Sequence, residues 1–160
     1  MDAVIDLAGI VTLLAAATLA GGQIFCLLAL LPALPEFTGE MSARVHQRAM
    51  TFRPHRYLRV VGAIAIVASA VTLALIFVED DNWAARTLMA VGLVTSILSG
   101  VVSTREWPIN EEINSWEDRP NLERYPTLRR KWDVQHKVRT VISIIALVSF
   151  AVAVVISDQL

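Results

Sequence analysis

The chain alternates between four long apolar segments and shorter charged ones. The apolar segments cover residues 7–31, 58–78, 86–104 and 139–157. A helix needs about 20 mostly apolar residues to cross the hydrocarbon core of a bilayer, and each segment is close to that length or longer. Buried helices of soluble proteins usually run shorter and keep a polar stripe. The pattern predicts an all-α polytopic membrane protein, a four-transmembrane-helix bundle with helical cytoplasmic loops that forms one domain over residues 1–160.

The first apolar segment is expected to be retained as a helix. No Lys or Arg precedes Arg44, and Asp2 and Asp6 are acidic, so the segment lacks the positively charged start of a signal peptide. The single cysteine, Cys26, lies inside this segment, which excludes an internal disulfide. Its expected role is that of a small buried side chain.

The basic residues divide unevenly between the two sides of the predicted bundle. Of the 14 Lys and Arg residues, only Arg86, at the start of the third span, lies on the side of the short loop between the second and third spans. The others lie in the two long loops or at the span ends that adjoin them. The positive-inside rule places these loops in the cytoplasm, with both termini outside. Trp83 in the short loop is a candidate interfacial anchor. The composition, rich in alanine and arginine, favours a bacterial plasma membrane.

The third loop is predicted to contain two helical pieces joined by a turn. Pro108 suits the first position of a helix, and Ile109, Ile113 and Trp116 recur at helical spacing. Residues 118–121 read as a turn. Pro126 can begin the next helix, so the fourth spanning helix is expected to begin outside the membrane near Thr127. The first loop is predicted to contain a short helix at residues 41–52, which ends at residues 53–54.

Three large polar or aromatic side chains share one face of the fourth helix. Trp132, His136 and Arg139 are spaced i, i+4 and i+7, and this face enters the bilayer at Arg139. Each has an ordinary interpretation: a belt aromatic, a solvated histidine and a snorkelling arginine. Their combination on one stripe predicts instead that they converge on one pocket.

Small and amide side chains mark two other helices. On the third span, Ser96, Ser99, Gly100 and Ser103 form a face whose expected role is close helix packing. Gln23 lies within the first apolar segment, where an amide must be hydrogen-bonded to another helix or to a ligand. Both alternatives for Gln23 remain open.

Other kinds of site find little support in the pattern. The three histidines form no His-x3-His pair, and no carboxylate lies four residues from His136, so we expect no metal centre. A glycine-rich nucleotide loop and a nucleophile elbow are missing. A net charge of -1 without a basic arm gives no reason to expect a nucleic-acid partner. The expected partners are the lipid bilayer and a hydrophobic small molecule, and small-residue faces also allow a homo-oligomer.

Two motifs in the second half of the chain resemble signatures of a known family. The first is TREWPIN at residues 104–110, followed by Trp116, and the second is WxxxHxxR at residues 132–139. They resemble the anthrone oxygenase-like family, long catalogued as a domain of unknown function. A glycine-rich first span ending at Pro32 and the segment at residues 46–48 fit more loosely. The similarity therefore extends over essentially the whole chain.

This resemblance implies a four-helix membrane protein and, for some members, oxidation of an anthrone to an anthraquinone by dioxygen without a metal or flavin. The residues of this chain fit such chemistry. His136 is predicted as the general base that forms an enolate, and Arg139 or an amide would stabilise the negative oxygen. The candidate catalytic residues are His136, Arg139 and Asn110, and the candidate substrate contacts are Trp132, Trp107, Trp116, Gln23 and Arg105.

Three functions stay open at this point. The first is a cofactor-independent membrane oxygenase that oxidises an anthrone-like polycyclic polyketide, with dioxygen as co-substrate. The second is a non-redox cyclase or isomerase of a natural-product intermediate, since base, cation and amide would serve an enolate equally well. The third is a membrane protein that binds a lipid-soluble molecule or a partner without chemistry.

Overall fold

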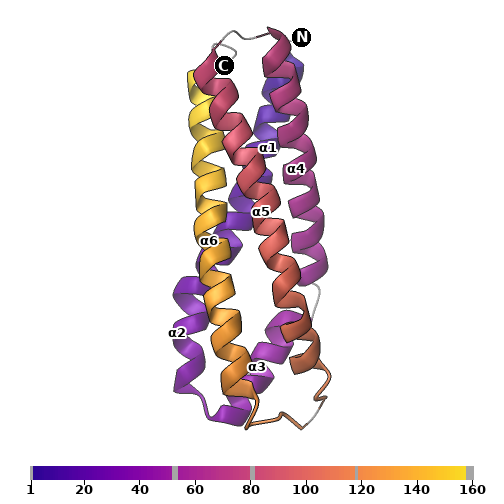
Figure 1. Ribbon diagram of the computed structural model, residues 1–160, viewed down its shortest axis with the longest axis vertical. Helices are drawn as coiled ribbons and strands as arrows, with labels where there is room; N and C mark the ends of the chain where they lie inside the picture. Colours follow the sequence, from indigo (N-terminus) through magenta and orange to yellow (C-terminus); the bar gives the residue numbers. More distant parts are fainter. Residues whose placement is uncertain (1, 52–53, 80–81, 118, 158–160) are drawn as a thin grey trace.

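Four long helices run side by side along the length of the molecule (Figure 1). The computed structural model describes residues 2–51, 54–79, 82–117 and 119–157, and no strand occurs within them. The long helices are α1 (Asp2–Phe25), α4 (Pro54–Glu79), α5 (Trp83–Asn114) and α6 (Tyr125–Ile156). The prediction of an all-α fold is confirmed.

All four candidate spans are long and apolar enough to cross a membrane, namely Ala3–Glu36, Tyr57–Val78, Trp83–Asn114 and Tyr125–Ile156. Much of their outward surface is apolar, as at Val67 on α4, which is 63% exposed. A bundle that is apolar both inside and outside suits a hydrocarbon environment. The protein is therefore an integral membrane protein.

The two ends of the bundle differ in what closes them. Both chain termini lie at one end, here called the terminal end, together with the end of α4 and the start of α5 (Figure 1). The short helix α3 (Gly39–Thr51) crosses the opposite end, called the α3 end. A helix predicted at residues 41–52 is thus confirmed to within a few residues. The predicted stop after it includes residues 52–53, which lie outside the described part of the chain.

The first apolar segment is less regular than its sequence suggests. After α1 comes a π-helical turn, η1 (Cys26–Leu30), then α2 (Leu31–Ala33) and a 3-10 turn, η2 (Leu34–Glu36). The N–H of Leu31 donates to the carbonyl of Cys26, five residues back. Pro32 follows at once and cannot donate a backbone hydrogen bond, which accounts for the change in pattern there. Cys26 is buried, as expected.

The expected break at Pro108 is wrong. α5 continues without interruption from Trp83 to Asn114 and carries Pro108 in its interior. The missing N–H deprives only the carbonyl of Thr104 of its usual donor. Asn82 begins this helix, because its side-chain oxygen accepts hydrogen bonds from the N–H groups of Ala84 and Ala85.

The start of the fourth helix agrees with prediction. α6 begins at Tyr125 with Pro126 in its first turn, two residues before the expected Thr127. The Tyr125 hydroxyl lies 3.1 Å from the Ser42 hydroxyl and 3.0 Å from its carbonyl oxygen, to which it donates. The Gln47 amide donates to the carbonyl of Ile113. These bonds fix α3 across the ends of α5 and α6.

Candidate functional site

A cavity of about 400 Å³ lies between α4 and α5, with α1 and α6 behind it. It exists because the facing positions carry small side chains, among them Gly62 on α4 and Gly100 on α5. A Cβ atom built on either glycine would meet no other atom within 4 Å. Arg59 and Trp107 also line the cavity and are exposed, so it reaches the molecular surface.

The small-residue face of α5 has a different role from the one expected. Ser96, Ser99, Gly100 and Ser103 all line the cavity instead of packing closely against a neighbouring helix. Two of them also contact α6: the Ser99 hydroxyl lies 2.9 Å from that of Ser143, and the Ser103 hydroxyl accepts a hydrogen bond from Arg139 at 3.2 Å. A close helix contact was expected here because small residues permit one, but whether it forms depends on the facing helix.

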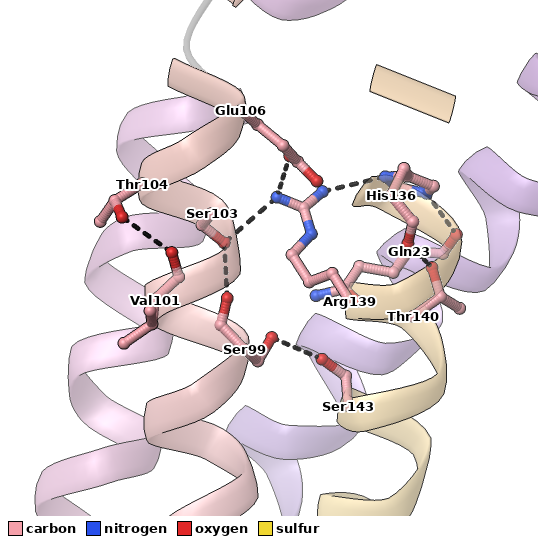
Figure 2. A network of polar contacts seen from close by, with 10 residues as sticks. All are labelled: Gln23, Ser99, Val101, Ser103, Thr104, Glu106, His136, Arg139, Thr140 and Ser143. Atoms are coloured by element: carbon pink, nitrogen blue, oxygen red, sulfur yellow. Dashed lines mark hydrogen bonds and ion pairs between the residues drawn. The ribbon is translucent and has the colours of Figure 1, made fainter. Parts of the chain in front are cut away.

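Arg139 is the centre of a polar network that forms one wall of the cavity (Figure 2). Its Nη1 lies 2.6 Å from Glu106 Oε2 in a buried ion pair and donates to the Ser103 hydroxyl at 3.2 Å. Its Nη2 lies 3.0 Å from His136 Nδ1. Three contacts from two helices therefore hold the guanidinium in one orientation, as Figure 2 shows.

His136 does not line the cavity itself but contacts Arg139, which does. Because an arginine can only donate, its hydrogen bond requires His136 Nδ1 to accept, which leaves the ring proton on Nε2. Nε2 then donates to the backbone carbonyl of Gln23 at 3.2 Å. Both ring nitrogens are thus engaged, and the side chain is buried.

Gln23 contacts another helix through its backbone, whereas its side-chain amide faces the cavity. Its backbone carbonyl joins α1 to α6 through His136. Its side chain lines the cavity, is only 6% exposed, and has an Oε1 without a hydrogen-bond partner among the described residues. A buried amide in that state is available to a bound molecule.

A separate cluster of aromatic and polar side chains occupies the core of the α3 end. The Trp132 ring stacks on His136 at 4.9 Å and meets the edge of His46 at 4.7 Å. The two nitrogens of His46 and Trp132 Nε1 have no hydrogen-bond partner in the described chain, although Asn110 lies nearby. Burial, and to a lesser degree the charge of Arg129, lowers the pKa of His46 to about 4. The ring is therefore neutral at pH 7.

The structure brings only part of the predicted site to the cavity. Gln23, Trp107 and Arg139 line it, and the Arg59 guanidinium stacks on the Trp107 ring at 4.0 Å. The other predicted residues do not line it. Of these, His136 contacts Arg139, Asn110 and Trp132 are buried near His46, Trp116 packs against Tyr125, and Arg105 is exposed.

Glu106 is the residue that sequence reasoning missed. It lies inside the first motif but between Arg105 and Trp107, where a charged residue resembles part of a solvated face. In the structure it is 2% exposed and pairs with Arg139. Glu106 follows Ser103 by three residues and therefore lies on the same face of the helix as the small residues. This spacing was the signal that could have identified it.

The charged and polar groups near the cavity include two guanidinium cations, an amide, hydroxyls and one carboxylate. Within the described ranges, no three His, Cys, Asp or Glu side chains are grouped so that they could hold a metal ion. The arrangement suits a mostly apolar molecule with one polar edge. Arg139 and Gln23 would meet that edge, and the ring of Trp107 offers a flat apolar surface.

Comparison with known proteins identifies the chain's relatives at the level of a family. No curated protein and no solved structure matches it. The family described as anthrone oxygenase matches residues 49–149, well over half of the chain. This region begins near the end of α3, includes both motifs, and contains Glu106, His136 and Arg139. The chain belongs to the anthrone oxygenase family.

Proposed function

We propose that this protein is a membrane oxygenase that oxidises an anthrone-like polycyclic polyketide with dioxygen in the cavity between α4 and α5. Membership of the anthrone oxygenase family favours an oxygenase in general. The observation that carries the more specific proposal is the cavity itself, about 400 Å³ in volume, with Arg139 fixed in its wall. Its size is within the range for small-molecule sites.

The chemistry begins with loss of a proton from the methylene group of the anthrone. The electron pair of the broken C–H bond spreads into the ring system and gives an enolate, whose charge lies largely on oxygen. Arg139 stabilises this oxygen, and Gln23 binds a neighbouring polar group. Two bases contact Arg139. One is His136, the base predicted from the sequence, and the other is Glu106.

The electron-rich enolate then reacts with dioxygen directly, and the proposal includes no metal or flavin. The overall reaction converts the methylene to a carbonyl and releases one molecule of water. The hydrophobic cavity excludes bulk water from the carbanion. Because the substrate dissolves poorly in water, delivery from the lipid through the surface opening beside Arg59 and Trp107 is favourable.

Oxygen uptake by the purified protein with emodin anthrone tests this function. We expect one O2 consumed per anthraquinone formed, and one atom of ¹⁸O incorporated from ¹⁸O2 into the new carbonyl, measured by rapid mass spectrometry. Formation of a different product without oxygen consumption would instead identify a non-redox cyclase or isomerase. Tight binding of the anthrone without any product would identify a binding protein.

The same proposal includes an orientation in the membrane. The α3 end carries most of the basic side chains, so it faces the cytoplasm of a bacterial cell, and the substrate site lies in the cytoplasmic leaflet. Single cysteines placed in the Cys26→Ala protein report the orientation. A cysteine at Ser115 should resist a membrane-impermeant maleimide in intact cells until the membrane is opened.

A further inference from the structure

We infer that Glu106 is the group that takes the substrate proton when the enolate forms on Arg139. This inference rests on the function proposed above and adds a residue that neither sequence motif reasoning nor the family match assigns. The step moves one proton: a carbon–hydrogen bond of the substrate breaks, its electron pair remains in the enolate, and an O–H bond forms on the Glu106 carboxylate.

Among the described residues, those that line the cavity include no base. The polar side chains that line it are hydroxyls, the Gln23 amide and the guanidinium groups of Arg59 and Arg139. None of these accepts a proton readily near neutral pH. The two bases directly behind the wall are His136 and Glu106, and both contact Arg139. The choice lies between them.

His136 is poorly placed to accept the proton. Its Nδ1 lone pair already accepts from Arg139 Nη2, and its other nitrogen faces the carbonyl of Gln23. Protonation at Nδ1 would break the first of these bonds and set an imidazolium 3.0 Å from a guanidinium nitrogen. Two like charges in a buried site repel strongly. In this arrangement His136 positions Arg139 and does not compete for the proton.

Glu106 has a free oxygen and a favourable charge balance. Oε2 pairs with Arg139, whereas Oε1 is buried and has no hydrogen-bond partner among the described residues. The resting site holds two opposite charges. If Glu106 takes the proton, the enolate replaces it as the partner of Arg139 and two charges remain. If His136 took it, four charges would be buried together, which is unfavourable because each buried ion loses its hydration.

The charged surroundings of Glu106 are compatible with this exchange. On α6, Arg139 pairs with Glu106, His136 contacts Arg139, and Asp133 pairs with Arg129. From η1 the nearest titratable group is Cys26. Arg59 of α4 lines the same cavity and stacks on Trp107. A water molecule among the cavity hydroxyls can carry the proton from the substrate carbon to Oε1 as the enolate displaces Oε2.

The test uses emodin anthrone with the purified protein in detergent under strict exclusion of oxygen, so that ionisation is observed without turnover. In the wild-type protein we expect the long-wavelength absorption of the bound enolate. Infrared difference spectra should show the carbonyl stretch of a newly protonated carboxylic acid. Glu106→Gln should lose that band and lower the enolate fraction by about tenfold or more.

The matched control is Glu112→Gln, which removes an outward-facing carboxylate from the same helix, one that pairs with Arg124. This variant should leave both signals unchanged. Glu106→Asp retains a carboxylate opposite Arg139 and is therefore expected to fold even if Glu106→Gln does not. Its carboxylic acid band should shift in frequency, and an unshifted band would overturn the inference.

Four further outcomes would overturn the inference, and the last of them would also overturn the proposed function. Enolate formation at the wild-type level in Glu106→Gln would overturn the role of Glu106. So would an enolate in the wild-type protein without a carboxylic acid band, or a loss confined to His136→Gln. In each of these cases the oxygenase function itself stands. Failure of the wild-type protein to bind the anthrone would remove the proposed function and this inference together.

Discussion

Two glycines on α5, eight residues apart, lie in opposite kinds of packing. A Cβ atom on Gly92 would lie 2.3 Å from the Phe150 ring of α6, too close for any side chain. A Cβ atom on Gly100 would meet nothing within 4 Å, because that position faces the cavity. The same residue type thus permits close packing of α5 against α6 in the terminal half, and leaves space between α5 and α4 in the α3 half. A glycine on a helix permits either close packing or a cavity, and the side chains of the facing helix decide which of the two forms.

The largest expected effect comes from filling the cavity. Gly100→Leu or Gly62→Leu should lower kcat/KM for emodin anthrone by about 100-fold or more, since the side chain occupies the volume needed by the rings. The thermal unfolding temperature in detergent should remain at or above that of the wild type, because glycine is unfavourable within a helix.

Gly21→Leu is the matched control for this comparison. Gly21 also lies within a helix and also has open space around its Cβ position, but it does not line the cavity. Activity equal to that of the wild type is expected. An equal loss of activity in Gly21→Leu and Gly100→Leu would show that the cavity is not the substrate site.

The reverse change is expected in the tightly packed half. Gly92→Ala should destabilise the protein by about 1–3 kcal/mol, because the methyl group overlaps the Phe150 ring and forces α5 and α6 apart. Thermal unfolding in detergent measures this effect. Pairing it with Phe150→Leu should recover part of the loss, and a stable Gly92→Ala protein would contradict the close contact.

Acid should weaken the α3 end through His46. The folded state lowers the pKa of His46 from 6.5 to about 4, so protonation favours unfolding. The stability that this group contributes is complete above pH 6.5 and is lost as the pH falls from 6.5 towards 4, on the order of 1 kcal/mol at pH 5.5. Unfolding followed across this range should show a shallower pH slope in His46→Phe. An unchanged slope would show that His46 does not titrate with unfolding.

The smallest expected effect concerns the hydroxyl pair beside the cavity. Ser99→Ala removes the 2.9 Å contact with Ser143 and should cost about 0.5–1.5 kcal/mol. The affinity for the anthrone should change less than threefold or so, since Arg139 and Gln23 carry the polar contacts. A large loss of affinity would indicate that the polar edge of the ligand lies near Ser99.

Much of the fold follows from local pattern. The four apolar segments are long enough to span a bilayer, and a chain in lipid must satisfy its backbone hydrogen bonds within helices, so helix number and order are predictable. Local signals failed where a neighbouring element intervened. Pro108 reads as a helix start, yet α5 continues through it. The π-helical turn at Cys26–Leu30 was not predicted either, although Pro32 directly after it was the available signal.

The candidate site was predictable only along single helices. The spacing of Trp132, His136 and Arg139 placed them on one face, and the structure joins them by stacking and a hydrogen bond. Residue spacing could not place Glu106 beside Arg139, because that ion pair joins two different helices. Spacing also could not distinguish Trp107, which lines the cavity, from Trp116, which packs against Tyr125.

The sequence by itself determined four membrane helices, the concentration of basic residues in the two long loops and the family to which the chain belongs. Hydrophobic length, charge placement and motif spacing act over short stretches of chain and need no partner. Only the tertiary structure decided that α4 and α5 stand apart at Gly62 and Gly100, and that Glu106 and His136 both hold Arg139. Cavities and buried ion pairs depend on which helices face each other and at what rotation, and that is set by the packing of the whole bundle.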